Sequence, residues 1–261
     1  MKTFQELQEG VYDPNIFKAI FLAGGPGSGK SYVVRRTTGG LGMKIVNSDD
    51  IYEKMLKDAG MVTTPEDIYS DKGQEIRVQA KGVTARMRGN FLEGRLGLII
   101  DGTGKDYDKI AKQVAGLKNL GYDTYMIFVN TSLDTAQQRN KLRDRTLAED
   151  EVTKMWNAVQ QNIGKFQRLF GGKNFIVVDN NDAGEDIFEK VWKRCMVLVR
   201  KKVGNRIAKS WIAKQLAMKE KGQETTPMGT GKGGGQRQRI APKRQREISK
   251  GGFARFARRT G

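Results

Sequence analysis

The sequence has no histidine and only one cysteine among its 261 residues. The lack of histidine excludes a histidine general base and a metal cage built of His and Cys ligands. The single thiol, Cys195, excludes an internal disulfide and favours a reducing, cytoplasmic location. Because Cys195 lies in an apolar stretch that favours a helix, we expect it to be buried and structural rather than a nucleophile. No apolar run approaches the length of a membrane helix, and the first residues do not have the pattern of a signal peptide.

Positive charge is abundant but unevenly distributed. The net charge is +18, and residues 200–261 contain 18 Lys and Arg against three acidic residues. That segment therefore contributes +15, and the first 199 residues contribute only +3. The first part has the charge balance of an ordinary enzyme domain, whereas the last part is typical of a segment that binds a polyanion.

Residues 24–31, Gly-Gly-Pro-Gly-Ser-Gly-Lys-Ser, match the phosphate-loop pattern G-x-x-x-x-G-K-[ST]. An apolar run at 17–23 predicts a buried strand before the loop, and residues 32–36 can continue as a helix after it. Glycines let the backbone approach a phosphate, and successive N–H groups at a helix N-terminus face the anion. Lys30 would reach the β- and γ-phosphates of ATP, and the Ser31 hydroxyl would bind Mg²⁺. The residues predicted to contact the nucleotide in this loop are Gly25, Pro26, Gly27, Ser28, Gly29, Lys30 and Ser31.

The rest of the first 200 residues alternates between apolar runs and helical patterns. Further strands are predicted at 43–47, 97–101, 123–129 and 175–179, and helices at 51–58, 74–92, 106–120, 133–143, 148–169 and 187–203. Strands that alternate with helices predict an α/β fold, a three-layer sandwich around a five-stranded, mostly parallel sheet. The loops that follow the strands would then meet at the carboxyl edge of that sheet.

Charged residues follow three of these strands. Asp49 and Asp50 come after the second strand and Asp101 after the third, while Arg139, Arg143 and Arg145 follow the fourth. One carboxylate can accept the proton of an attacking hydroxyl, a second can orient Mg²⁺, and arginines suit phosphate. We expect one of the two adjacent aspartates to cap the helix at 51–58 and the other to be catalytic. The alternatives are that Asp101 is only a turn residue and that the arginines form an exposed charged face.

These motifs together resemble the 5′-kinase domain of phage-type polynucleotide kinase and, more loosely, the zeta-toxin-like kinases. The resemblance covers residues 17–170 and is carried by the phosphate loop and by residues 46–50, 100–103 and 139–143. In addition to the roles expected from the residues for Arg139 on the nucleotide phosphates and for Asp101 on Mg²⁺, it implies that Asp49 is the general base and that Arg143 contacts the nucleotide phosphates. It also implies transfer of the γ-phosphoryl group of ATP to a hydroxyl, with a nucleic-acid 5′-hydroxyl as the first candidate.

The sequence departs from this family at two places. Asp101 and Thr103 match a family segment that reads Asp-Thr-Asn, but Gly102 interrupts the match. The second departure concerns the acceptor. Tyr52 stands where the polynucleotide kinases carry an arginine for the acceptor phosphate, so Arg77, Arg86 or Arg88 would have to replace that arginine. The open alternatives are a zeta-like or nucleotide small-molecule kinase and a nucleic-acid-binding phosphate-loop NTPase without kinase activity.

The composition predicts three regions: a kinase domain at 1–200, a basic amphipathic helix at 201–221 and a disordered tail rich in Gly and Arg at 222–261. The helix suits nucleic acid, a membrane surface or docking on the domain. The tail carries Phe253 and Phe256 among arginines, and such aromatics can stack on bases. We expect the tail to tether RNA or DNA, the alternative being a solvated tail without a partner.

Overall fold

The computed structural model describes residues 11–38, 41–142, 146–182 and 185–222. Contacts divide the chain into two units, Met1–Met228 and Gly229–Gly261, and all the described residues belong to the first. The strands are β1 (Lys18–Ala23), β2 (Lys44–Val46), β3 (Leu98–Ile100), β4 (Asp123–Asn130) and β5 (Phe175–Asp179). The helices are α2 (Lys30–Thr38), α3 (Ser48–Asp58), α4 (Pro65–Tyr69), α5 (Asp71–Glu93), α6 (Tyr107–Asn119), α7 (Leu133–Lys141), α8 (Glu149–Gln160), α9 (Ile163–Phe170), α10 (Glu185–Arg200) and α11 (Arg206–Glu220), with a 3-10 turn η1 (Gly172–Asn174).

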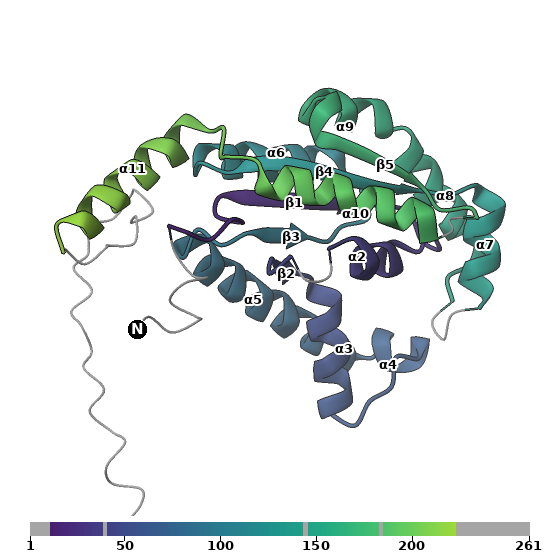
Figure 1. Ribbon diagram of the computed structural model, residues 1–261. Coiled ribbons are helices and arrows are strands. Elements are labelled where there is room, and N and C mark those ends of the chain that lie inside the picture. Colours follow the sequence, from purple (N-terminus) through teal and green to yellow (C-terminus); the bar gives the residue numbers. More distant parts are fainter. Residues whose placement is uncertain (1–10, 39–40, 143–145, 183–184, 223–261) are drawn as a thin grey trace, which may run out of the picture. The chain divides into compact units, whose positions relative to one another are not determined.

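The five strands form one sheet in the order β2-β3-β1-β4-β5, and every pairing is parallel (Figure 1). The central strand β1 pairs with β3 and β4, so that Phe21 lies opposite both Ile100 and Met126. All six residues of β1 are buried, as expected for a parallel sheet that helices cover on both faces. The predicted α/β class with a five-stranded sheet is confirmed.

Alternate residues of β1 face two separate cores. Ile20 and Leu22 pack with side chains of α2 and α10, among them Cys195, which is fully buried as expected. Ala19 and Phe21 pack with side chains of α6, α8, α9 and α11 on the opposite face. This alternation follows from the period of two in a strand, and it explains why an uninterrupted apolar run is needed at this position. Figure 1 shows α10 in front of the sheet and α6 behind it.

The helix predicted at 148–169 is in fact two helices, α8 and α9, so that prediction was wrong in one respect. The break lies at Asn162, whose side chain is buried. Its amide donates hydrogen bonds of 3.0 Å to the carbonyls of Gly104 and Lys105 in the loop after β3. Hydrogen bonds to a distant loop thus end the helical run, and this loop also contains Asp101, directly after β3.

The basic helix α11 docks on the domain by its apolar side. Ala208 is buried in the core, and the Trp211 ring stands edge-on to Phe17 at 5.3 Å between ring centroids. Lys209 and Lys214 on the same helix are exposed. The apolar side of α11 therefore docks on the domain, which was one of the three uses expected for this helix. Its basic side remains exposed. Residues 223–261 of the predicted tail lie outside the described residues.

In the part of the chain that the structure describes, no helix is both long and apolar enough to cross a membrane.

Candidate active site

The phosphate loop connects β1 to α2 and is tied to the neighbouring strand's loop. The Gly24 N–H donates to the Thr103 carbonyl at 3.0 Å, and the Ser28 N–H donates to the Gly25 carbonyl at 3.2 Å. Lys30 is the first residue of α2 and Ser31 the second, as the motif requires. The loop therefore presents its backbone N–H groups at a helix N-terminus, where the helix dipole favours an anion.

Two glycines of this loop are required by their surroundings. Gly27 and Gly29 have φ of 72° and 74°, which L side chains rarely adopt. A Cβ at Gly27 would overlap the Ala136 carbonyl of α7, and a Cβ at Gly29 would overlap the Asn180 side chain after β5. The loop is thus held between two elements that follow β4 and β5, and neither position leaves room for a side chain.

Lys30 and Asp101 form an ion pair at the centre of the site. The Lys30 Nζ and Asp101 Oδ1 atoms are 2.6 Å apart, and the two side chains are only 16% and 15% exposed. Asp101 directly follows β3, and its N–H donates to the Val46 carbonyl of β2 at 3.2 Å. From the sequence we expected Lys30 to contact phosphate and Asp101 to help to hold a metal. The direct contact between the two side chains was not predicted. Lys30 is therefore positioned by a carboxylate at the edge of the loop.

Asn47 caps α3, so the expectation that Asp49 or Asp50 would do so was wrong. The Asn47 Oδ1 accepts a hydrogen bond of 2.9 Å from the Asp49 N–H, and the Asn47 amide donates to Asp50 Oδ1 at 2.8 Å. Asn47 has the extended backbone of a cap residue, whereas both aspartates lie inside the first turn. The structure thus leaves both carboxylates exposed in the first turn of α3.

The two aspartates differ in their electrostatic surroundings. Partial burial raises the pKa of the Asp50 carboxyl, and the negative charge of Asp101 raises it further, while the positive charge of Lys30 opposes the shift. Asp50 is therefore coupled to the Lys30–Asp101 pair. The neighbouring Asp49 is exposed at the start of the same helix.

The oxygen donors near the loop fit Mg²⁺. The Ser31 hydroxyl and the Asp101 carboxylate are hard ligands, and Mg²⁺ usually takes one or two protein ligands together with phosphate and water. A cation near Asp101 would also offset the repulsion that Asp101 exerts on Asp50. Among the described residues no group of three or more acidic or cysteine side chains forms a closed cage. Ser31 and Asp101 would therefore hold a metal together with phosphate and water.

Arg139 lies beside the phosphate loop, and its guanidinium donates hydrogen bonds to the loop that follows β5. Its guanidinium donates to the carbonyls of Asn180 and Asn181 at 2.7 and 2.9 Å, and the Asn180 amide donates to the Ser28 carbonyl at 2.7 Å. Two of the five N–H donors of Arg139 are thereby engaged. Sequence reasoning missed both asparagines, although two polar residues directly after a buried strand are a usable signal. Arg143 and Arg145 lie outside the described residues.

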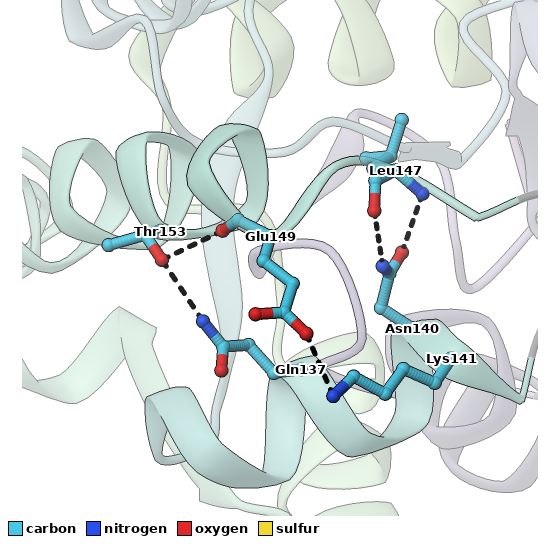
Figure 2. Close-up of polar contacts among 6 residues, drawn as sticks. All are labelled: Gln137, Asn140, Lys141, Leu147, Glu149 and Thr153. Atoms are coloured by element: carbon cyan, nitrogen blue, oxygen red, sulfur yellow. Dashed lines mark hydrogen bonds and ion pairs between the residues drawn. The ribbon is translucent and has the colours of Figure 1, made fainter.

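Side-chain hydrogen bonds and an ion pair join α7 to α8 and to Leu147 just before it. The buried Asn140 amide donates to the Leu147 carbonyl at 2.8 Å and accepts from the Leu147 N–H at 3.1 Å (Figure 2). The remaining contacts are a Gln137–Thr153 hydrogen bond of 3.1 Å and a Lys141–Glu149 ion pair of 2.8 Å. These contacts hold α7 in place, and α7 in turn contacts the phosphate loop through the Ala136 carbonyl.

A cavity of about 540 Å³ opens beside the Lys30–Asp101 pair. Its walls are the ends of β1, β2 and β3, part of α5 and the start of α6. Of the arginines that could replace the family's acceptor arginine, Arg88 lines this cavity. Arg77 instead stands over the ring of the buried Tyr52, 4.9 Å from its centroid, and Arg86 is exposed.

A family model described as an AAA domain matches residues 20–166, more than half of the chain. No curated protein matches the chain at a significant level. Among solved structures, the AvrRxo1-ORF1:AvrRxo1-ORF2 complex with sulphate ions is 13% identical, with a TM-score of 0.50 over 67% of this chain and 63% of that chain. At this identity the likeness concerns the fold alone.

Two further solved structures are similar. The PezAT chromosomal toxin–antitoxin system of Streptococcus pneumoniae is 16% identical, with a TM-score of 0.49 over 72% of this chain and 87% of that chain. Shikimate kinase from Acinetobacter baumannii is 19% identical, with a TM-score of 0.44 over 74% of this chain and 99% of that chain.

Proposed function

This chain belongs to the AAA domain family and has the α/β fold of phosphate-loop kinases, and we propose that it is an ATP-dependent phosphotransferase with a hydroxyl acceptor. One observation carries the proposal: the phosphate-loop lysine, Lys30, pairs with Asp101, and Asp101 lines a cavity that could hold an acceptor. A nucleotide site that serves only as a switch, or that is vestigial, would not need a cavity for an acceptor next to the Lys30–Asp101 pair.

In the proposed reaction, the phosphate loop and the N-terminus of α2 bind the β- and γ-phosphates through backbone N–H groups. Lys30 reaches the same phosphates, while Ser31 and Asp101 would hold Mg²⁺, which supplies positive charge to the transferring group. Arg139 and Arg143 contribute further charge around the phosphates.

The acceptor oxygen attacks the γ-phosphorus, its bond to that phosphorus forms, and the bond to the ADP oxygen breaks. Asp49 accepts the proton of the acceptor hydroxyl. Asp49 suits this role because its carboxylate is exposed at the start of α3 and belongs to no ion pair among the residues that the structure describes. Asp50, in contrast, is coupled to Asp101 and Lys30.

The finer proposal is that the acceptor is the 5′-hydroxyl of a nucleic acid. The +15 charge of residues 200–261 supports it, because sequence-independent binding of RNA or DNA rests mainly on neutralising phosphates. The exposed lysines of α11 belong to that basic segment and carry part of its charge on the folded unit. The alternative is a small-molecule hydroxyl, with the basic segment serving only to localise the enzyme.

The test is transfer of label from γ-labelled ATP with Mg²⁺ to a panel of acceptors. The panel contains 5′-hydroxyl RNA and DNA oligonucleotides, nucleoside monophosphates and UDP-sugars. Label on an oligonucleotide supports the finer proposal, and label on a small molecule supports the alternative. ATP binding without transfer to any of them would count against a kinase.

The base is tested by Asp49→Asn, which we expect to lower the transfer rate at least about 100-fold, as loss of a general base does. Asp58→Asn, at the exposed end of the same helix, is the matched control and should change little. If Asp50→Asn abolished transfer and Asp49→Asn did not, the role of base would pass to Asp50.

A further inference from the structure

The outer side of α10 leaves large apolar side chains in contact with solvent. Trp192 is 38% exposed and Val197 is 68% exposed, whereas Cys195 on the inner side is buried in the core. Figure 1 shows this helix on the outside of the sheet. A groove of about 580 Å³ lies on its outer side, lined by Trp192, Lys193, Met196, Val197, Arg200 and Lys201. An indole that is partly in solvent and lies in a groove offers an apolar surface to a partner.

The same groove is positively charged. Its three charged lining residues are all cations, and the Lys193 Nζ pairs with the Glu189 Oε1 at 2.7 Å. Arg200 and Lys201 form no ion pair with any of the residues that the structure describes. Residues 190–221 contain 11 Lys and Arg against one acidic residue, Glu220. The groove thus combines an apolar surface with positive charge that the described protein does not neutralise.

The backbone at the cationic end of the groove is held by contacts from the sheet. The buried Lys18 ammonium of β1 donates to the Lys201 carbonyl at 2.5 Å. The Asp123 carboxylate of β4 accepts a hydrogen bond of 2.7 Å from the Gly204 N–H. These contacts fix the chain where α10 ends, so binding at Arg200 and Lys201 does not require the backbone to be ordered first.

We propose that this groove binds single-stranded nucleic acid, with a base stacked on Trp192 and backbone phosphates on Arg200 and Lys201. Every base has a flat π surface that stacks on an indole, so such binding needs no particular base sequence. A guanidinium donates to two phosphate oxygens at once, and a lysine adds a point charge. Arg200 follows Trp192 by about two helical turns, or about 12 Å along the axis, so a short stretch of strand reaches both.

The make-up of the groove favours this partner over a protein or a membrane. A stable protein interface buries a far larger surface than the three apolar side chains of this groove provide. A helix that lies in a membrane surface buries its apolar face there, but the apolar face of α10 is packed against the sheet. A few apolar side chains beside unpaired cations match a base and its neighbouring phosphates. The groove contains none of the residues assigned to phosphate transfer, so this inference goes beyond the proposed function and does not depend on it.

The first experiment locates the contact by photo-crosslinking. The full chain is irradiated with single-stranded oligothymidylate in which 5-iodouracil replaces one thymine, and the crosslinked residues are identified by mass spectrometry after digestion. We expect Trp192 to be crosslinked, and an excess of unlabelled oligothymidylate should remove that crosslink. Because the readout is local, binding elsewhere on the chain does not imitate it. Crosslinks confined to residues 223–261 would overturn the proposal.

Stacking is tested by two variants of the same residue, measured by fluorescence anisotropy with labelled oligothymidylate at about 0.2 M salt, where purely electrostatic binding is weak. Trp192→Leu keeps an apolar side chain but removes the ring, so it should weaken binding at least about fivefold, as loss of one base–aromatic stack does. Trp192→Phe keeps a ring and should stay within about threefold of the unaltered protein. Equal losses in the two variants would refute stacking.

The phosphate contact is tested by Arg200→Gln, with Arg194→Gln as the matched control. Arg194 is exposed on the same helix but does not line the groove. Arg200→Gln should weaken binding and make the slope of log K against log salt shallower by about 0.7, the value of one phosphate contact on a single strand. Arg194→Gln should leave that slope unchanged. Equal effects would indicate general attraction to a positive helix and would refute the groove, and a thermal melt followed by circular dichroism checks the fold of each variant.

The other partners and the phosphotransferase proposal give different results. Trp192-dependent binding to vesicles of phosphatidylcholine and phosphatidylserine, without binding of oligothymidylate, would refute the nucleic-acid groove. A Trp192 crosslink in a protein that transfers no label from ATP would refute the phosphotransferase and leave the groove standing. Label transfer by a protein that gives no crosslink on α10 would refute the groove and leave the phosphotransferase standing.

Discussion

Replacing Asn140 should loosen the connection between α7 and α8 and thereby disturb the phosphate loop. The Asn140 side chain is 2% exposed and satisfies both the N–H and the carbonyl of Leu147 (Figure 2). Asn140→Leu keeps a similar volume but removes the donor and the acceptor together. Because the Ala136 carbonyl of the same helix contacts Gly27, we expect the variant to bind ATP more weakly as well.

The magnitude follows from the two hydrogen bonds. Each neutral hydrogen bond contributes about 1 kcal/mol to the free energy of unfolding, and each partner left unsatisfied adds a cost of its own. We therefore expect Asn140→Leu to cost about 3 kcal/mol. For a domain of this size, 1 kcal/mol corresponds to roughly 2–4 °C, so the Tm should fall by roughly 6–12 °C.

The assay is thermal unfolding followed by circular dichroism, with Gln137→Ala as the matched control. The Gln137 amide makes one bond to Thr153, which keeps its own bond of 2.8 Å to the Glu149 carbonyl. The control should therefore cost less than about 1 kcal/mol. A fall in Tm for Asn140→Leu no larger than that of Gln137→Ala would refute the reasoning.

Three further predictions concern the folded unit. Burial raises the pKa of the Cys195 thiol to about 12, so an aromatic disulfide reagent should label it only after denaturation, and rapid labelling of the native protein would contradict this. Trp211→Ala should lower the free energy of unfolding, measured in urea, by roughly 2–3 kcal/mol, since the ring is only partly buried. Lys209→Ala should change it by no more than about 0.5 kcal/mol, because this side chain is exposed. Equal costs for the two variants would argue against docking of α11. Burial raises the pKa of Tyr122 and Tyr125, so the folded protein holds their protons after the unfolded chain has released them. Stability should therefore fall as the pH rises above about 10, by up to about 2.7 kcal/mol per pH unit for the two groups, and Tyr122→Phe should halve that slope; a flat profile would contradict the burial argument.

Several features could be predicted from local sequence. The phosphate loop was placed by its glycines and by Lys30-Ser31, and each of the five strands lies within about one residue of its predicted range. The strands were predictable because a strand buried on both faces needs an unbroken apolar run bounded by polar or glycine residues. The short helix α4 begins with Pro65 directly behind the cap residue Thr64, which is a helix-start signal that the local sequence carries.

The errors arose where a distant partner decided a local feature. The run at 148–169 has helical periodicity throughout, but Asn162 breaks it by bonding the loop after β3. At α3, two aspartates suggested a cap, yet Asn47, two residues before Asp49, took that place and donates a hydrogen bond to Asp50 as well. Propensity alone ranks these residues almost equally as caps, so the choice depends on where the strand ends.

The sequence by itself determined which residues can bind a nucleotide phosphate, because a glycine loop between a strand and a helix is a local property of the chain. Only the tertiary structure decided which of the other charged residues share that site. The order β2-β3-β1-β4-β5 brings Asp101 to Lys30, the loop after β5 to Arg139, and α5 with Arg88 to the same cavity. Such contacts join side chains from separate elements, and local propensity carries no information on which strands become neighbours.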